Sequence, residues 1–242
     1  MPMYNADHIQ VRIEQLCADA AFQDSVQRIR PGKFRRTSES SDYAARLTYT
    51  TALREFVYNP AALNFILSNA ELKALFFRTF GYTGSLDFTM YPNCWLRDLP
   101  LLDIGEKAYL ADGIVLGTNQ VSTDQRFVTA DVIRIGARTV FDQDCMIGYG
   151  TAVGADCVIG IRCAIGIKSA IGDGTSIGEI VNIGHGCHIG SAVRIGQVCA
   201  IGNFSMIEEG VALPDQTRLP AFSRVSSTGI FHRRTGERIA AL

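Results

Sequence analysis

The chain has no excess of either charge. Its 242 residues include 23 Lys and Arg against 24 Asp and Glu, which gives a formal net charge of −1 at pH 7. A nucleic-acid-binding protein needs a basic surface for the phosphate backbone, so this balance argues against a nucleic-acid partner. It favours a small or locally charged partner instead.

Long apolar runs are also missing. No stretch approaches the roughly 20 apolar residues that a membrane-spanning helix needs. The first residues, MPMYNADHIQVRIEQL, alternate charged with apolar side chains instead of forming the apolar centre of a signal peptide. We therefore expect no membrane partner and a cytoplasmic location. The cysteine count of 7 is odd, and the placement of the cysteines, described below, favours reduced thiols over disulfides.

The first third of the chain has a helical pattern. Between residues 7 and 80 the apolar residues recur at spacings of three and four, which is typical of amphipathic helices. The segment RPGKFRR ends the first helix, a second follows Ser40, and a third apolar stretch begins at Pro60 and closes at Gly81. The sequence thus predicts a small α-helical N-terminal domain over residues 1–82.

From Ile104 onward the period changes to six. The residue after each sixth position is glycine from Gly136 to Gly202, with Asp142 as the exception. The sixth positions themselves hold apolar residues without interruption: Ile135, Phe141, Ile147, Val153, Ile159, Ile165, Ile171, Ile177, Ile183, Ile189, Ile195, Ile201, Ile207 and Leu213. Small residues stand two positions earlier: Thr139, Cys145, Thr151, Cys157, Cys163, Ser169, Thr175, Val181, Cys187, Val193, Cys199, Ser205 and Val211.

A period of six suits short strands joined by tight turns, and it does not suit a helix. The pattern predicts a coiled parallel β-solenoid in which the apolar residue points inward and glycine permits the backbone of each corner. The small column must then also face the interior, where a free cysteine behaves as a small hydrophobe. Packing therefore explains five of the seven cysteines.

The repeat Ile-Gly-x-x-(Thr/Cys/Val)-x, from Ile104 to Leu213, resembles that of the hexapeptide-repeat acyltransferases. The resemblance implies a mainly β fold, a left-handed parallel β-helix with three hexapeptides in each coil. Residues eighteen apart would then stack at about 4.8 Å. We expect this acyltransferase domain over residues 83–230 and a C-terminal tail over residues 231–242. The segment TNQVSTDQRFVTAD is expected to contain a protruding loop.

The segment IVNIGHGCHIG resembles the part of the sugar O- and N-acetyltransferases and lipid A acyltransferases that carries their catalytic histidine, and His185 falls on that position. His185 follows the inward Ile183 by two residues, so it should point outward at a corner. Acyl transfer needs a base that removes the acceptor's proton, and histidine suits this role. His188 precedes the inward Ile189 on another part of the coil, where we expect a solvated surface residue.

Asn203 follows His185 by one expected coil. Its main-chain amide is a candidate donor to the oxyanion of the tetrahedral intermediate. Its side chain could instead orient the imidazole, or it could be an ordinary turn asparagine. In the enzymes that the chain resembles, this position is often glycine.

The resemblance also implies a co-substrate and an assembly. Acetyl-CoA or another acyl-CoA would be the donor, with no permanently bound cofactor, and would lie between two β-helices of a homotrimer. The acceptor would be a hydroxyl or amine of a small molecule or sugar. The basic segment RIRPGKFRR could meet a phosphate, a carrier protein or a nucleotide sugar, or be a solvated loop. The candidates for CoA binding are Gly202, Lys168, Arg218, Arg224, Arg233 and Arg234.

Two other functions are compatible with the repeat. One is a non-catalytic β-helix scaffold for assembly, with the helical domain as its interaction module. The other is a gamma-type carbonic anhydrase, whose zinc is held by three histidines from two subunits, with paired ligands five residues apart. Here His185 and His188 are three apart and the repeats hold no third histidine. The sequence therefore predicts no metal ligands.

Overall fold

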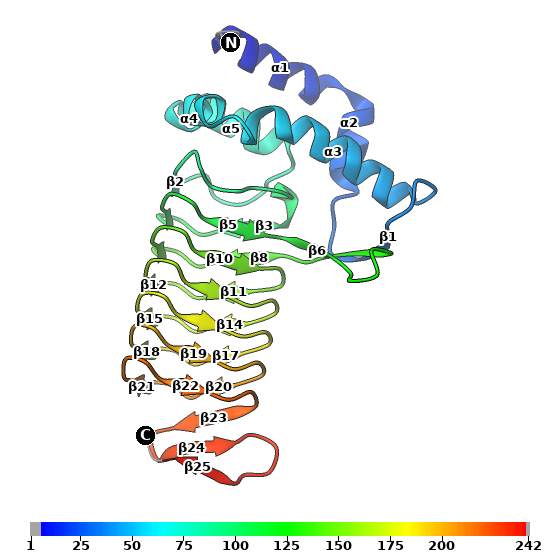
Figure 1. Cartoon of the computed structure of the whole chain (residues 1–242). Coiled ribbons are helices and arrows are strands. Elements are labelled where there is room, and N and C mark those ends of the chain that lie inside the picture. Colours follow the sequence, from blue (N-terminus) through cyan, green and yellow to red (C-terminus); the bar gives the residue numbers. More distant parts are fainter. Residues whose placement is uncertain (1–5, 241–242) are drawn as a thin grey trace.

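A computed structural model of the chain describes residues 6–240 and places a layer of helices over one end of a β-solenoid (Figure 1). Within that range no helix combines the length and apolar character needed to cross a bilayer. The α-helices are α1 (Ala6–Ala18), α2 (Ala20–Gln27), α3 (Ser41–Val57), α4 (Pro60–Ser68) and α5 (Ala70–Thr79), and a 3-10 turn, η1, covers Leu99–Leu101.

Two of the expected helices are each divided in two. The Asp19 side chain accepts hydrogen bonds from the amides of Ala21 and Phe22, at 2.9 and 3.1 Å, and so begins α2. The Asn69 side chain accepts from the amide of Leu72 at 3.0 Å and begins α5. Each side chain satisfies amides that lack partners at a helix start, so it stabilises a new start. The apolar spacing continues across both breaks and therefore does not reveal them.

The helices pack through an aromatic cluster. Phe22, Tyr49, Phe56, Phe76 and Phe80 are buried, and their rings meet mostly edge to face, with the centroids of Phe22 and Phe80 5.3 Å apart. Such pairs stabilise beyond the apolar area they bury. The same hydrophobic core continues into the solenoid without interruption.

Three parallel sheets form the walls of the solenoid. The six-stranded sheet consists of β5 (Val115–Gly117), β10 (Met146–Gly148), β13 (Ala164–Ile165), β16 (Asn182–Ile183), β19 (Ala200–Ile201) and β22 (Arg218–Leu219). The seven-stranded sheet consists of β2 (Thr89–Met90), β4 (Tyr109–Leu110), β9 (Val140–Phe141), β12 (Val158–Ile159), β15 (Ser176–Ile177), β18 (Arg194–Ile195) and β21 (Ala212–Leu213).

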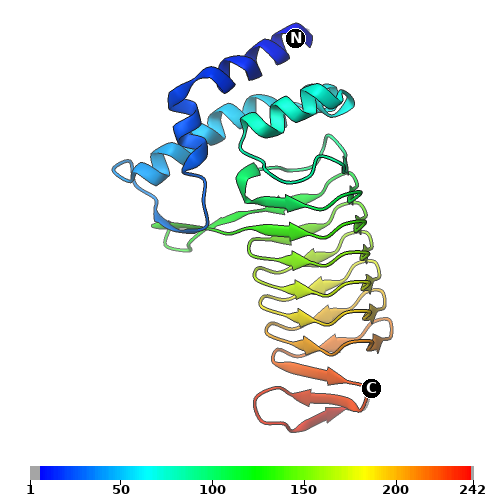
Figure 2. The same cartoon turned by 180° about the vertical axis from the view of Figure 1, so that it is seen from behind.

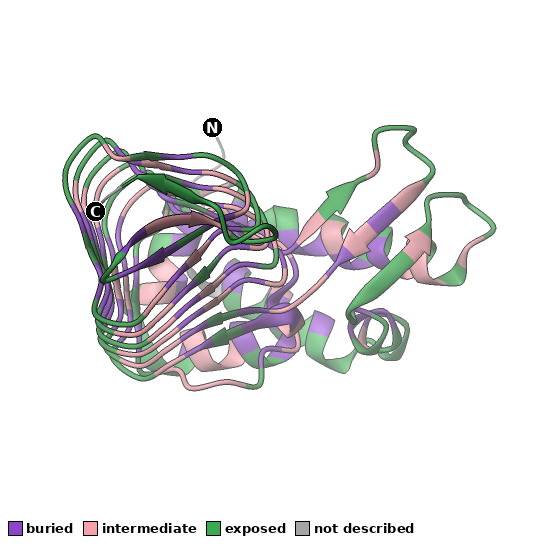
Figure 3. Ribbon diagram, turned by 90° about the horizontal axis from the view of Figure 1, so that it is seen from below, coloured by how far each residue is buried: buried purple, intermediate pink, exposed green. Residues whose placement is uncertain are grey.

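The third wall ends in two antiparallel hairpins at the C-terminal end. This nine-stranded sheet consists of β3 (Leu102–Ile104), β8 (Ile133–Ile135), β11 (Ala152–Val153), β14 (Ala170–Ile171), β17 (His188–Ile189), β20 (Met206–Ile207), β23 (Ser223–Ser226), β24 (Gly229–His232) and β25 (Arg238–Ala240). Seen along its axis, the solenoid has buried, intermediate and exposed residues following one another along the ribbon of each coil (Figure 3).

The register confirms the predicted β-solenoid with three hexapeptides in each coil. Ile147 pairs with Ile165, which pairs with Ile183, and each step is eighteen residues. Every apolar sixth position from Ile135 to Leu213 is buried, and so is every residue of the small column. The coils begin at β2, before the repeat can be recognised in the sequence.

The corner glycines have a different cause from the expected one. Most of them do not have a positive φ; at Gly178 an added Cβ would lie 2.9 Å from the backbone of the next coil, at Gln197. Glycine is therefore needed for the close approach of coils. The left-handed conformation falls two residues later and is taken by ordinary residues such as Ile180 and Val198, both at φ 57°.

The basic segment RPGKFRR is a strand, where a solvated loop was one expectation. β1 (Gly32–Arg35) pairs antiparallel with β7 (Phe127–Ala130), which also pairs with β6 (Asn119–Val121). This three-stranded sheet extends sideways from the solenoid beneath the helices in both views (Figures 1 and 2). The β6–β7 hairpin is the protrusion predicted for TNQVSTDQRFVTAD. The hairpin lengthens the chain between two coils, so Leu116 pairs with Ile147 instead of with the residue eighteen positions later.

Candidate functional site

A groove of about 550 Å³ runs along the six-stranded sheet and the corner that follows it. Its floor includes Met146, Ala164 and Asn182, the outward residues of β10, β13 and β16. His185 and Asn203 line the corner side. The structure thus brings both predicted catalytic residues into one groove, on consecutive coils about 4.8 Å apart along the axis.

His185 is exposed, and its ring is held from one side. The main-chain amide of Ile167, one coil earlier, donates to His185 Nδ1 at 3.1 Å. Because Nδ1 uses its lone pair in this bond, the proton of the neutral ring lies on Nε2. In this arrangement Nε2 is a hydrogen-bond donor.

Asn203 continues the same pattern one coil further. Its side-chain oxygen accepts from the main-chain amide of His185 at 2.8 Å, so it positions the backbone at His185 and does not contact the ring. The next residue in this column is Ala221, whose side chain has no acceptor. The amide of Asn203 itself has no acceptor among the described residues. It is therefore free to donate to a ligand in the groove.

His188 lies on a different wall. It is the outward residue of β17, and it lines a second groove, of about 430 Å³, on the nine-stranded sheet. The two histidines therefore do not face a common ligand. Over residues 6–240 no three His, Cys, Asp or Glu side chains gather as a possible metal site.

The basic candidates are divided between the walls. Lys168 is exposed at the corner of the His185 groove, directly after Ile167. Arg218 is exposed on β22, at the C-terminal end of the sheet that forms the groove floor. Arg224 lies on the nine-stranded sheet, where its Nε donates to Glu208 at 2.8 Å. Arg224 is thus on the wall of His188.

Arg233 and Arg234 reach the corner below Asn203 from the turn after β24. Arg233 Nη1 donates to the carbonyl of Phe204 at 3.0 Å. The Arg234 guanidinium lies 4.0 Å from the centre of the Phe222 ring, which stacks on Phe204 with centroids 5.2 Å apart. Two cations and two aromatic faces therefore extend the corner that carries His185. Gly202 lies at the same corner, where an added Cβ would meet the backbone of Ala221.

Sequence reasoning missed the other end of the groove. Trp95, Asn119 and Gln120 line it where the helical layer meets the solenoid. Trp95 forms a parallel bridge with Val115 and precedes the recognisable repeat. These residues follow no hexapeptide pattern, so only the fold brings them to the groove.

Comparison with models of known protein families finds no match, and comparison with curated proteins finds none either. Among solved structures, a mutant of perosamine N-acetyltransferase from Caulobacter crescentus, in complex with CoA and GDP-perosamine, is 14% identical with a TM-score of 0.35, over 61% of this chain and 56% of that one. The acetyltransferase domain of PglB from Neisseria gonorrhoeae is 18% identical with a TM-score of 0.32, over 52% and 54%. LpxA from Bacteroides fragilis, a UDP-N-acetylglucosamine acyltransferase, is 14% identical with a TM-score of 0.31, over 60% and 59%. The match thus spans little more than half of each of these proteins.

Proposed function

We propose that this protein is an acyltransferase that moves an acetyl or other acyl group from CoA to a hydroxyl or amine of a small molecule or sugar. The observation that carries the proposal is the pairing, in one groove, of the exposed His185 with the amide of Asn203, which has no acceptor within residues 6–240. Acyl transfer needs a group that accepts a proton and a donor for the oxyanion. The resemblance of IVNIGHGCHIG to the catalytic segment of such enzymes agrees with this pairing.

In the proposed reaction the acceptor's oxygen or nitrogen attacks the thioester carbonyl while His185 takes the acceptor's proton. The carbonyl oxygen becomes negative and accepts a hydrogen bond from the amide of Asn203. When the tetrahedral intermediate collapses, the carbon–sulfur bond breaks and the CoA thiolate takes the proton from the imidazolium. The products are the acylated acceptor and free CoA, and His185 returns to its neutral form.

A base acting through Nε2 needs the proton of the resting ring on Nδ1, which is the reverse of the arrangement in the structure. We propose that the exposed ring turns about its Cβ–Cγ bond when the acceptor binds and gives up its bond with Ile167. The freed lone pair of Nδ1 then takes the acceptor's proton, while Nε2 keeps its own. One such hydrogen bond contributes only about 1 kcal/mol net to stability, so its loss is a small barrier to the turn. Nitrogen-15 NMR of the histidine ring should find the Nε2–H tautomer in the free protein; an Nδ1–H tautomer there would remove the need for a turn.

For the donor, Lys168, Arg233 and Arg234 are the charges that support CoA binding at this corner. Phosphates favour such guanidinium groups because they form paired, charge-assisted hydrogen bonds. Arg218 extends the same wall. Arg224 lies on another wall of the same chain, so it could contact CoA in this groove only from a neighbouring subunit.

We also propose a homotrimer with a site at each subunit interface. Met146, Val158 and Ile180 are large apolar side chains that are 51 to 55% exposed on the solenoid walls and corner. Packing against a neighbouring subunit would remove this apolar surface from water. Light scattering should report three chains per particle, and a monomer with full activity would contradict the proposal.

The enzyme assay compares His185→Ala with His188→Ala, because the second change removes an exposed histidine from another wall. Release of free CoA is followed with acetyl-CoA and a panel of hydroxyl and amine acceptors. If His185 is the base, its loss should lower kcat about 10²- to 10⁴-fold and leave CoA affinity nearly unchanged. His188→Ala should retain most of the activity.

Thermal-shift measurements separate the enzyme from the scaffold. An acyl-CoA at a hundred times its dissociation constant should stabilise the fold by about 2.7 kcal/mol. Absence of a shift with acetyl-CoA, succinyl-CoA and CoA would favour the scaffold. Equal and mild losses in the two histidine variants would reject His185 as the base.

A further inference from the structure

A second pocket, of about 200 Å³, lies between α3, the β6–β7 hairpin and the segment after β1. This volume is about six or seven times the roughly 30 Å³ that one water molecule occupies in the liquid. Four of its lining residues are arginines, Arg36, Arg46, Arg54 and Arg97, and none of its lining residues is acidic. They come from three distant parts of the chain, so only the fold assembles them.

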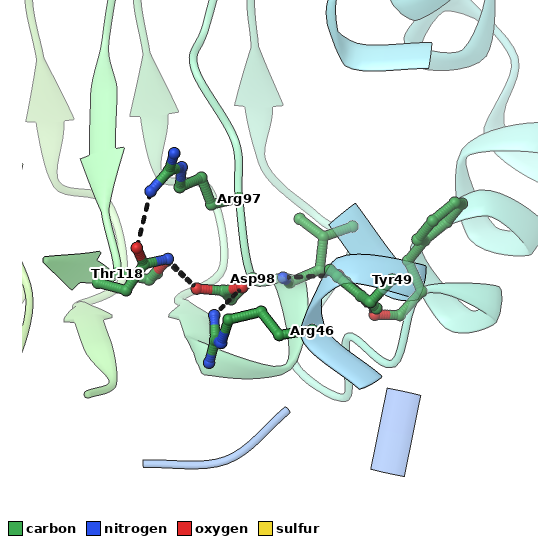
Figure 4. A network of polar contacts seen from close by, with 8 residues as sticks. Arg46, Tyr49, Arg97, Asp98 and Thr118 are labelled. Atoms are coloured by element: carbon green, nitrogen blue, oxygen red, sulfur yellow. Dashed lines mark hydrogen bonds and ion pairs between the residues drawn. The ribbon is translucent and has the colours of Figure 1, made fainter. Parts of the chain in front are cut away.

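Arg46 is the buried member of this group. Its side chain is 9% exposed, and its Nη1 bonds the carboxylate of Asp98 at 2.5 Å (Figure 4). Its Nη2 is buried and has no hydrogen-bond partner within the described part of the chain. A buried donor without an acceptor is costly, and more so when it is charged. The pocket wall therefore contains an unsatisfied cationic donor.

Asp98, which pairs with Arg46 but does not line the pocket, cannot neutralise the four arginines. Asp98 already accepts hydrogen bonds from Thr118 and Asn119, at 2.7 and 2.6 Å, in addition to the one from Arg46. Over residues 6–240, Arg36, Arg54 and Arg97 form no ion pair. Of these four guanidinium groups, that of Arg46 alone pairs with a carboxylate within residues 6–240.

The other three arginines lie near aromatic rings and, within residues 6–240, pair with no carboxylate. The guanidinium carbons of Arg36 and Arg54 lie 6.0 and 5.4 Å from the ring centres of Tyr43 and Tyr58. Arg97 lies 4.4 Å from the Trp95 ring and donates to Asn119 at 2.7 Å. A cation–π contact does not use the N–H groups of a guanidinium as donors to an acceptor, so these groups can still bond an anion.

We propose that this arginine pocket binds the phosphoryl group of a small molecule. A tetrahedral phosphate accepts several charge-assisted hydrogen bonds at once, so it can bond more than one of these guanidinium groups. The pocket volume suits one or two phosphoryl groups and part of the molecule that carries them. The chain's own charge is nearly balanced, so this is a local concentration of positive charge and not a general basic surface.

The arginine pocket adjoins the groove of His185. Asn119 lines both, and its two amide atoms bond Asp98 on one side and Arg97 on the other. A phosphorylated ligand held here would therefore occupy the helical end of that groove. The binding proposal itself is independent of acyl transfer, because it rests on the arginines alone.

The test is titration calorimetry of the full chain with orthophosphate, pyrophosphate and ADP at constant ionic strength. We compare the parent with Arg36→Gln/Arg54→Gln, which changes two exposed arginines without ion pairs. The control, Arg28→Gln/Arg162→Gln, removes the same charge from two exposed arginines outside the pocket. At least one of the ligands should bind with a Kd below about 1 mM, and the pocket variant should weaken this by tenfold or more, as expected for charged hydrogen bonds. The control should stay within about threefold.

The three ligands also separate the sources of the phosphoryl group. Equal affinity for orthophosphate and ADP identifies free phosphate, and at least tenfold tighter binding of ADP identifies a phosphorylated small molecule. Absence of saturable binding up to 10 mM, or equal weakening in the two double variants, overturns the proposal. His185→Ala should bind phosphate like the parent, so failure of this proposal and failure of acyl transfer are distinguishable.

Discussion

Individual residues of the small inward column have a polar role besides filling space. Cys187 Sγ and Cys163 Sγ donate to the carbonyls of Gly202 and Gly178 at 3.2 and 3.0 Å, and Thr151 bonds the carbonyl of Gly166 in the same way at 3.0 Å. Each donor lies fifteen residues before its acceptor. Cys, Ser and Thr share a small size and one donor, which explains why they alternate in this column.

The thiols should differ sharply in reactivity. All seven cysteines are free; Cys17 is exposed and the other six are buried. Burial raises the pKa of Cys94 to about 11 and raises the pKa values of Cys157 and Cys187. Because the thiolate is the reactive form, these thiols should be slow. Titration with a disulfide reagent at pH 8 should find one fast thiol in the folded protein and seven after denaturation. A native disulfide between two column cysteines would contradict the inward placement.

Each corner of the solenoid places two requirements on the backbone, and they fall on different residues. The residue after each inward aliphatic must lack a Cβ because the next coil approaches closely. The residue two positions later has a positive φ, and at Gly174, where φ is 64°, no atom lies within 4 Å of an added Cβ. The first requirement is steric and the second is conformational.

These two requirements predict that a side chain is tolerated poorly at the first of these positions and well at the second. Gly178→Ala should lower the melting temperature by several degrees, because its Cβ would lie 2.9 Å from main-chain atoms that belong to the next coil. Gly174→Asn should change it by no more than about 3 °C, because asparagine adopts the left-handed conformation with little strain. Scanning calorimetry of both variants checks this, and a larger loss for Gly174→Asn would reject the steric explanation.

At the scale of the molecule, a buried polar network joins the helical layer to the first coils. Arg46 lies on α3, Asp98 directly precedes η1, and Thr118 lies between β5 and β6 (Figure 4). The hydroxyl of Tyr49, also on α3, accepts from the amide of Leu99 at 3.0 Å. The orientation of the helices on the solenoid therefore depends on these buried hydrogen bonds.

Removal of the Asp98 carboxylate should strongly destabilise the fold. Asp98→Ala leaves the Arg46 charge buried and unpaired, and such changes typically lower stability by about 3–5 kcal/mol. For a chain of this size that corresponds to a fall in melting temperature on the order of 10 °C. Glu106→Ala, at an exposed acidic residue, is the matched control and should shift the melting temperature by no more than about 2 °C. Similar shifts in the two variants would show that the network does not stabilise the junction.

The sequence by itself determined the solenoid, its coil length and which side chains face inward, because each coil repeats the same local pattern and stacks on its neighbour. It also marked His185, since the corner position follows directly from Ile183. The tertiary structure decided where the helices break and how segments with different sequence patterns contact one another. The breaks at Asp19 and Asn69 depend on side-chain caps that leave the apolar period unchanged.

The arginine pocket depends on segments far apart in the sequence, which only folding brings together. Arg36, Arg54 and Arg97 belong to no repeat or common motif in the sequence. The β6–β7 hairpin interrupts the repeat and carries Asn119 to the junction, where β7 pairs with the basic strand β1. Periodicity records only contacts between equivalent positions of neighbouring coils. Contacts between unlike segments follow no period, and so only the three-dimensional structure could decide them.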